Sequence, residues 1–242
     1  TGSDNPSELI IDNNKSVKAI FSFFEAGQGT EEDPYQIANF SQLNEVRNHL
    51  DDHFILINDI DASPTEFSNL GMGFMPIGNE NSPFEGTFKG NGFTITDLKI
   101  SRPNGQNIVA GVNSGELKNI VVSGSVTGGN QVGGIAGRSI DRISSSQSAA
   151  SVTGNDNTGG IVGLNEGQIS ASSSSGTVQG SVFRTGGLAG NNSGLVLRSF
   201  STSNVNGDSM TGGLIGHNRG NGYVSESYAT GDVSGNERVG GL

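Results

Sequence analysis

The sequence contains no cysteine and no tryptophan, and apolar side chains make up only 32 % of it. Without cysteine, the chain can form no disulfide scaffold, thiol nucleophile, zinc–thiolate site or iron–sulfur cluster. No stretch approaches the about 20 apolar residues that a membrane helix needs, so we expect no membrane span. Basic residues are also scarce: 13 Lys and Arg against 24 Asp and Glu give a formal net charge of −11. We therefore expect no nucleic-acid partner.

Glycine, by contrast, is abundant, with 39 residues in a chain of 242. The first 104 residues contain 9 of them, together with 16 acidic and 6 basic side chains and ten of the 12 phenylalanines. Residues 105–242 contain the other 30 glycines, with 8 acidic and 7 basic side chains. We therefore divide the chain into an N-terminal strand segment and capping region, residues 1–104, and a glycine-rich region, residues 105–242.

The glycines of the second region recur at a nearly constant period. They form adjacent pairs with spacings of 26, 27, 26 and 28 residues, and an aliphatic residue follows each pair. The second glycines of the pairs are Gly134, Gly160, Gly187, Gly213 and Gly241. Each repeat also carries a valine, at Val152, Val178, Val205 and Val233, with a glycine two positions later. A flexible linker keeps no such register, so we predict a solenoid of about five coils.

Each repeat has three short β-type segments separated by turn residues. Helical repeats need longer apolar stripes, and WD-type propeller blades need about 40–45 residues. The pattern predicts an all-β fold: a right-handed parallel β-helix (β-solenoid) with an N-terminal cap that contains one short α-helix. Coils about 4.8 Å apart would enclose a narrow interior, which explains the low apolar content. We expect the glycines at corners that need a positive φ or a close approach of backbones.

A column of serines accompanies the repeat, at Ser146, Ser172, Ser199 and Ser227. We interpret it as a ladder of hydroxyl groups that bond between adjacent coils. The functional alternative is a ligand-binding or ice-binding surface. A flat ice-binding face would need regular rows of threonine, whereas the threonines of this region look scattered, at Thr153, Thr158, Thr177, Thr185 and Thr211.

The first region has the features of a cap over the open end of the solenoid, where unpaired strand edges must be covered. Residues 41–50 are predicted to form a helix that Ser41 caps, with Leu43, Val46 and Leu50 on one face. Residues 54–57 and 93–96 are predicted strands. The alternating segment 9–24 is either the first strand of the cap or a strand donated to a neighbouring molecule.

Two of the repeat units, GGIVGLNEGQISASSSSGTVQG and GGLIGHNRGNGYVSESYATGDVSG, resemble the GLUG-motif repeat. The glycine pair, the N-x-G turn (Asn165 to Gly167, Asn192 to Gly194) and the S-x-A-T-G-x-V-x-G tail carry the resemblance. It covers residues 105–242, and the segment 138–141 departs from it because the N-x-G turn is missing there. Residues 1–104 resemble what precedes such repeats in large bacterial surface proteins. The resemblance implies a secreted or cell-surface region, often of an adhesin, sometimes an accessory region of surface proteases such as IgA-cleaving peptidases.

Chemistry-bearing residues form no recognisable catalytic arrangement in the sequence. The charged residues of the repeats occupy different positions in their units, and the histidines, His49, His53 and His217, are dispersed. No nucleophile-elbow, zincin, EF-hand or phosphate-loop motif is present, so we assign no catalytic residue. Calcium is the one cofactor that we keep open: Asp59 and Asp61 offer suitable oxygen ligands, and solvated surface carboxylates are the alternative.

From these features we expect a non-enzymatic extracellular adhesin or stalk-type structural region at a bacterial cell surface, presenting a rigid β-helix face. One alternative is a self-assembling subunit of a cell-surface filament, because the sequence stops as a new repeat begins. Another is a carbohydrate-binding or polysaccharide-degrading β-helix protein. The partners expected are a host-cell, matrix or glycan surface, or further copies of the same chain; no ligand-binding residue is assigned.

Overall fold

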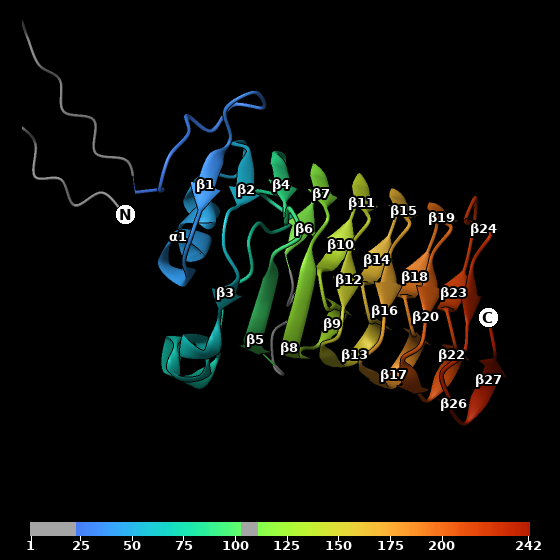
Figure 1. Cartoon of the computed structure of the whole chain (residues 1–242). Coiled ribbons are helices and arrows are strands. Elements are labelled where there is room, and N and C mark those ends of the chain that lie inside the picture. The colour runs from blue at the N-terminus through green and yellow to red at the C-terminus, as the bar shows by residue number, and fades with distance from the viewer. Residues whose placement is uncertain (1–22, 103–110) are drawn as a thin grey trace, which may run out of the picture.

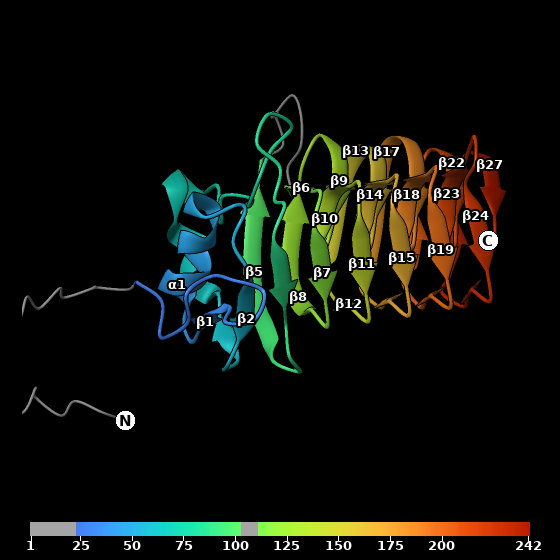
Figure 2. The same cartoon turned by 90° about the horizontal axis from the view of Figure 1, so that it is seen from above.

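The computed structural model describes residues 23–102 and 111–242 and shows a rod of stacked parallel strands (Figures 1 and 2). The cap lies at one end of the rod and strand β27 at the other. The predicted parallel β-solenoid is therefore confirmed. The boundary at residue 104 lies outside the described residues, as does most of the predicted strand 9–24; its last two residues, Phe23 and Phe24, form a bend.

Three parallel sheets, here called sheets 1 to 3, run along the rod. Sheet 1 consists of β1 (Tyr35–Ile37), β2 (Phe54–Leu56), β4 (Thr87–Lys89), β7 (Glu116–Lys118), β11 (Arg142–Ser144), β15 (Gln168–Ser170), β19 (Leu195–Leu197) and β24 (Tyr223–Ser225). Sheet 2 consists of β6 (Val112–Asn113), β10 (Ala136–Ser139), β14 (Val162–Asn165), β18 (Ala189–Asn192) and β23 (Ile215–Asn218).

Sheet 3 is the largest and contains 14 strands. They are β3 (Ile60–Asp61), β5 (Thr94–Ser101), β8 (Val121–Thr127), β9 (Asn130–Gly133), β12 (Gln147–Ser148), β13 (Ser151–Gly159), β16 (Ser173–Ser174), β17 (Thr177–Gly186), β20 (Phe200–Ser201), β21 (Asn204–Asn206), β22 (Ser209–Gly212), β25 (Tyr228–Ala229), β26 (Val233–Ser234) and β27 (Glu237–Gly240). Each coil of the repeat region contributes strands to all three sheets.

Equivalent repeat positions lie directly above one another in the rod. Val152 pairs with Val178, which pairs with Val205 in the next coil. The aliphatic position of sheet 1 behaves in the same way, because Ile143 pairs with Ile169. Both columns are buried, so each coil contributes one thin apolar layer to a continuous core.

The cap contains a shorter helix than the sequence suggested. Helix α1 spans Phe40–Glu45, and a 3₁₀ turn, η1 (Val46–Asn48), continues it. The predicted cap residue Ser41 is wrong: Asn39 has the extended backbone of an N-cap, and its side-chain oxygen accepts a hydrogen bond from the Gln42 backbone N–H at 3.1 Å. Asn and Ser are about equally good caps, so the choice depended on where the backbone turns.

The second glycine of each of the first three pairs packs closely against a serine of sheet 3, and we call this part of the coil its waist. A Cβ atom on Gly134 would overlap the Ser148 hydroxyl of sheet 3, and one on Gly160 would overlap Ser174. Gly187 faces Ser201 in the same way. Because glycine packs against serine here, the coil closes with few apolar atoms, which explains the low apolar fraction of the sequence.

Positive φ angles in the coils occur mainly at residues other than glycine, contrary to part of our expectation. Two left-handed columns run along the rod, and they consist of Asn119, Ser145, Ala171, Arg198 and Glu226, and of Gln131, Asn157, Arg184, Met210 and Arg238. The glycines of the first four pairs are instead required by close approach, because a side chain there would meet the backbone of the neighbouring coil, whereas the last pair, Gly240 and Gly241, has no such neighbour.

Candidate functional site

The predicted serine column forms a continuous hydrogen-bonded ladder, in which Ser146, Ser172 and Ser199 are buried and Ser227, in the last coil, is half-buried. The Ser172 hydroxyl donates to the Ser170 carbonyl of its own coil at 2.9 Å and accepts the Ser146 backbone N–H at 3.1 Å. Ser146 and Ser199 repeat this arrangement: their hydroxyls accept the backbone N–H of Ile120 and of Ser172 and donate to a carbonyl of their own coil. The hydroxyls therefore point into the protein and bond coil to coil, so this column presents nothing to a ligand.

A second ladder, of asparagines, lies on sheet 2, and sequence reasoning missed it as a bonded column. The Asn165 side-chain N–H donates to the Asn192 side-chain oxygen at 2.6 Å, and Asn192 donates to Asn218 at 2.7 Å. Ser139 occupies the corresponding place one coil earlier and accepts from Asn113 at 3.1 Å. Ser139 forms no hydrogen bond with the side chain of Asn165. The buried side-chain oxygen of Asn165 therefore has no partner among the described residues. The missing N-x-G turn thus marks a defect in the ladder.

The threonines are less scattered than the sequence suggested. Thr158, Thr185 and Thr211 pair in register across adjacent coils and are almost completely buried. A Cβ atom on Gly154 would overlap the Thr158 hydroxyl, so the glycine of the V-x-G tail makes room for this column. The interpretation of these three as irregular was wrong. Their constant position immediately before each glycine pair is the sequence signal that could have identified this column. Because they are buried, they cannot form part of an ice-binding face.

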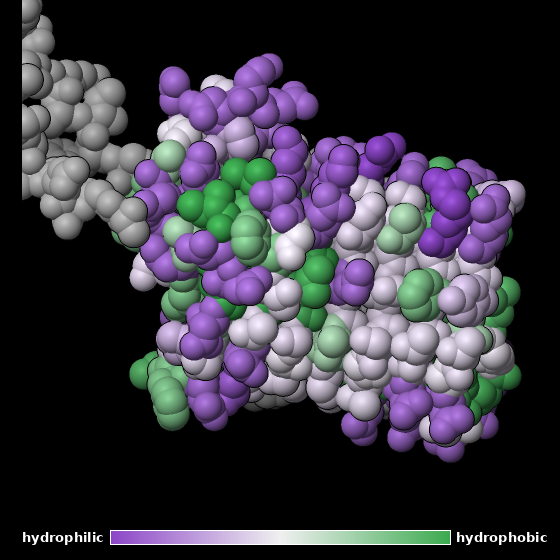
Figure 3. Space-filling view, in the orientation of Figure 1, coloured by the Kyte–Doolittle hydropathy of each residue, from purple (hydrophilic) through white to green (hydrophobic). Residues whose placement is uncertain are grey.

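The outward side of sheet 3 carries a shallow polar groove of about 260 Å³. Two columns of exposed or half-exposed polar side chains form its walls, and buried Val178 and Val205 lie between them. One wall consists of Ser151, Thr177, Asn204 and Asp232, and the other of Thr153, Gln179, Asn206 and Ser234. We call this feature the sheet-3 groove. In the space-filling view, the coil region is mostly pale, the colour of intermediate hydropathy, whereas the cap end is strongly coloured (Figure 3).

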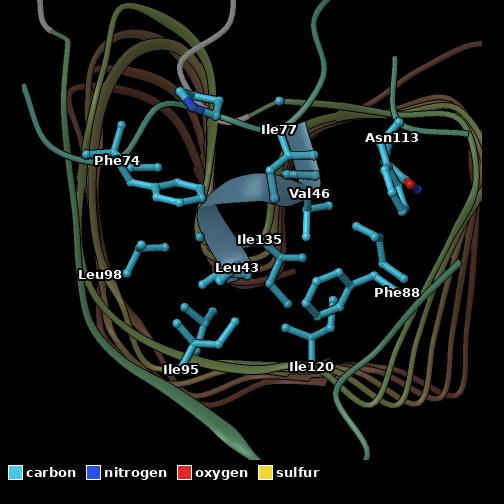
Figure 4. A pocket seen from close by; sticks show the side chains of 18 of the residues that line it. Leu43, Val46, Phe74, Ile77, Phe88, Ile95, Leu98, Asn113, Ile120 and Ile135 are labelled. Atoms are coloured by element: carbon cyan, nitrogen blue, oxygen red, sulfur yellow. The ribbon is translucent and has the colours of Figure 1, made fainter. Parts of the chain in front are cut away.

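A cavity of about 120 Å³ lies where the cap meets the first coils (Figure 4). Leu43 and Val46 of the helical segment, Phe74, Phe88 and Ile135 project toward it. Asn113 is the one polar side chain among the described lining residues, and its amide already donates to the Gly115 carbonyl and to Ser139. The described lining residues offer this cavity no acid, base or nucleophile, so it suits packing rather than chemistry.

The two calcium candidates are engaged by the backbone. The Asp59 carboxylate accepts the Thr94 N–H at 2.8 Å, and the Asp61 carboxylate accepts the Ser63 N–H at 2.8 Å. Hydrogen bonding from the Ser63 side chain and backbone holds the pKa of Asp61 below its ordinary value. Residues 23–102 and 111–242 contain no group of three or more His, Cys, Asp or Glu side chains arranged to hold a metal ion. The structure therefore adds no further ligand to this pair.

The histidines lie apart from one another, two in the cap and one in the coils. His49 bonds to Asp52 at 3.0 Å and lies 3.7 Å from Glu45, at the end of the helical segment. His217 lies on β23, and burial lowers its pKa, with a further contribution from the charges of Arg184, Arg219 and Arg238. Neither arrangement places a histidine next to one of the ladder serines, whose hydroxyls already donate to backbone carbonyls.

Opposite charges of the repeats pair between adjacent coils, although they occupy different repeat positions. Arg138 contacts Glu166 of the next coil at 2.6 Å, and Arg184 contacts Asp156 of the previous coil at 3.0 Å. These half-exposed pairs contribute little to stability individually, but they favour the same register as the ladders. In the part of the chain that the structure describes, no helix is long and apolar enough to cross a membrane.

The chain is similar in sequence to two curated proteins and in fold to one solved structure. No protein-family model matches the chain. Halomucin of Haloquadratum walsbyi is 32 % identical over 148 residues, which is 47 % of this chain and 2 % of halomucin. A protein of Evansella cellulosilytica named "Putative Gly-rich membrane protein" is 39 % identical over 113 residues, 44 % of this chain and 13 % of that protein. The chain thus spans a small part of the curated relatives that it matches.

The fold also occurs in a solved structure, that of a Bacteroides ovatus protein described as a "putative immunoglobulin A1 protease". The two chains are 23 % identical and superpose with a TM-score of 0.72, over 88 % of this chain and 70 % of the other. At this identity the likeness shows a shared β-solenoid architecture.

Proposed function

We propose that this chain is a non-enzymatic, extracellular GLUG-type β-solenoid that serves as a rigid stalk or adhesin region of a larger cell-surface protein. The observation that carries the proposal is the bonding between adjacent coils, which keeps one register even where the asparagine ladder is interrupted at Ser139. Serine and asparagine ladders, closely packed glycines and stacked valines join adjacent coils in this register. Such a rod transmits load and holds its outer faces at fixed spacing, because each coil is supported by its neighbours.

The comparisons support a surface location. The two relatives are named a halomucin and a Gly-rich membrane protein, and the chain matches only a short part of each, as expected for one region of a long modular protein. The structural neighbour's name concerns a protease. We place a protease role second, because the ladder serines of this chain are bonded to backbone groups and no described histidine is positioned to activate them.

Surface labelling tests this proposal directly. Antibodies raised against residues 111–242 should label intact cells of the producing organism about as strongly as permeabilised cells. A cytoplasmic protein probed in parallel must be labelled only after permeabilisation. If the solenoid is also detected only after permeabilisation, the surface role is wrong.

The non-enzymatic part of the proposal has its own test. The purified chain should leave immunoglobulin A1 and a panel of soluble proteins uncleaved over a prolonged incubation. Reproducible cleavage would contradict it, provided that a variant with His217→Gln and His49→Gln lost the activity and so excluded a contaminating protease.

A further inference from the structure

The outward side of sheet 3 is a regular array of neutral hydrogen-bonding groups. Burial alternates strictly along its strands: Ser201, Ser203 and Val205 are buried, whereas Thr202, Asn204 and Asn206 face solvent. Parallel pairing repeats this pattern in each coil, so polar side chains stack in columns about 4.8 Å apart. Within the sheet-3 groove, two such columns face each other across the buried valines.

Several of these groups have hydrogen-bonding capacity that the protein does not use. Gln179 and Asn206 are exposed and lie in neighbouring positions of one column. Neither side chain forms a hydrogen bond with another described residue, whereas Ser151 and Thr177 on the opposite wall bond to each other at 2.8 Å. A free amide offers donors and an acceptor together. The wall formed by Gln179 and Asn206 can therefore both donate hydrogen bonds to a hydroxyl group of a ligand and accept one from it.

The charge of the groove restricts the class of ligand. Among its described lining residues, Asp232 is the one charged side chain, and none is a lysine or an arginine. Anionic chains such as nucleic acids or uronic-acid polymers would meet repulsion without any compensating cation. A peptide strand would need an open sheet edge, and the groove lies on a sheet face. A neutral molecule rich in hydroxyl groups fits these constraints.

Two aromatic rings border the same face. Phe200 and Tyr228 pair in adjacent coils and stack with their centroids 5.2 Å apart and an interplanar angle of 5°. In the preceding coil, their column contains the small side chain of Ser173. Neither ring lines the sheet-3 groove, but both add apolar ring faces to the polar outer side of the same sheet. A sugar likewise combines C–H faces with a polar rim.

We propose that the sheet-3 groove binds a neutral polysaccharide chain that lies extended along the solenoid axis. Gln179 and Asn206 bind the sugar hydroxyls, and successive coils offer equivalent groups at about the 4.8 Å strand spacing, a step comparable to one sugar unit. From Ser151 to Asp232 the groove crosses four coils. It thus accommodates a short run of sugar units rather than a single one. The proposal deepens the proposed surface role by naming the face that makes contact.

Affinity electrophoresis of the purified chain provides the test. Gels would contain one soluble polysaccharide each: mixed-linkage β-glucan, xylan, galactomannan or dextran as neutral probes, and alginate or polygalacturonate as acidic probes. We expect retardation by at least one neutral probe and by neither acidic probe. Isothermal titration with oligosaccharides of the retained polymer should show affinity rising with chain length up to a few units and then levelling off.

Variants then locate the site. Gln179→Ala with Asn206→Ala should weaken binding about tenfold or more, because several hydrogen bonds to the ligand are lost together. Thr177→Trp should block the groove by filling it. The matched control is Gln168→Ala, which removes a half-exposed amide of the same coil on sheet 1 and should leave binding unchanged. Circular dichroism of each variant checks that the fold is retained.

Three results would overturn the proposal: no retardation by any neutral probe, retardation by acidic probes alone, or equal binding by the wild type and the groove variants. Surface labelling separates this failure from failure of the surface role. Cells that are labelled while the chain retains no glycan would leave the stalk role standing and refute the groove as a glycan site.

Discussion

Gly187→Ala should destabilise the solenoid strongly, because it places one methyl group at the waist of the coil. An ideal Cβ there would lie 2.1 Å from the Gly213 carbonyl oxygen and 2.2 Å from the Ser201 hydroxyl oxygen. Neither neighbour can move freely. Gly213 belongs to the backbone of the next coil, and Ser201 is completely buried on sheet 3.

The magnitude follows from two effects. Overpacking a close-packed interior costs about 1–3 kcal/mol. Displacing the next coil also weakens the hydrogen bond that the Gly187 N–H donates to the Gly212 carbonyl at 3.2 Å, and a buried group left unpaired costs about 1–3 kcal/mol. We therefore expect a loss of about 2–6 kcal/mol, which corresponds to a drop in Tm of roughly 4–24 °C for a chain of this size. The larger Gly187→Val substitution should be at least as damaging.

Thermal unfolding followed by circular dichroism measures the effect, and the repeat supplies its own control. Gly241 occupies the same repeat position, but an added Cβ there would meet nothing within 4 Å. Gly241→Ala should therefore change stability by less than about 0.5 kcal/mol. Adding Ser201→Gly to Gly187→Ala should restore part of the loss, because it removes one of the two overlaps. Equal Tm values for Gly187→Ala, Gly241→Ala and the wild type would refute the explanation from close packing at the waist.

Three further predictions follow from the ladders and from His217. Ser172→Ala should lower the free energy of unfolding, measured in urea, by about 1–3 kcal/mol, because the buried Ser146 N–H loses its acceptor. The exposed control Ser175→Ala should leave this free energy almost unchanged. Ser139→Asn should raise the free energy of unfolding by about 1 kcal/mol, because its amide supplies the missing donor to Asn165; a fall in stability would show that the site has no room. The folded pKa of His217 lies below its ordinary value, so its contribution to stability is present above about pH 6.5 and is lost as the pH falls through the folded pKa. His217→Gln should therefore show a smaller fall in Tm between about pH 7.5 and 5.5 than the wild type, and an equal fall would contradict this assignment.

The fold class could be predicted from the sequence because equivalent residues of adjacent coils contact one another. Each coil therefore needs the same type of residue at the same place in the repeat. A glycine at the waist meets the waist glycine of the next coil, and Val152 stacks on Val178, so every coil repeats the same requirement. The valine columns and the serine ladder could be recognised in the sequence for the same reason. Residues that contact their own equivalents leave a periodic signal.

Features that depend on local backbone direction were less accessible. The helix began one residue earlier than expected because Asn39, rather than Ser41, has the extended N-cap conformation. Left-handed corners were expected at glycines, but residues such as Ala171 and Arg198 occupy them, since the bonding on both sides of each corner fixes the backbone. Amino-acid type alone does not reveal such tertiary constraint.

The candidate site was the hardest part to anticipate. Simple alternation indicates which residues of sheet 3 face outward, but the groove also depends on the register between coils, which places Thr177 beside Asn204 and Gln179 beside Asn206. The Thr158 column shows the reverse case, in which polar residues that suggested an exposed surface are buried. Their constant position before each glycine pair was the signal for a buried column, and residue type alone suggested the opposite.

Adjacent coils pair in parallel register, and paired cysteine substitution tests this register directly in a chain that has no cysteine of its own. Thr153 and Gln179 are register partners on the outward side of sheet 3. In-register Cα atoms lie about 4.8 Å apart, within disulfide range, whereas a diagonal pair lies about 8 Å apart and outside it. Thr153→Cys with Gln179→Cys should form an intramolecular disulfide under mild oxidation, and Thr153→Cys with Thr177→Cys should remain reduced. Efficient bonding of the diagonal pair with none of the in-register pair would contradict the coil arrangement on which the account rests.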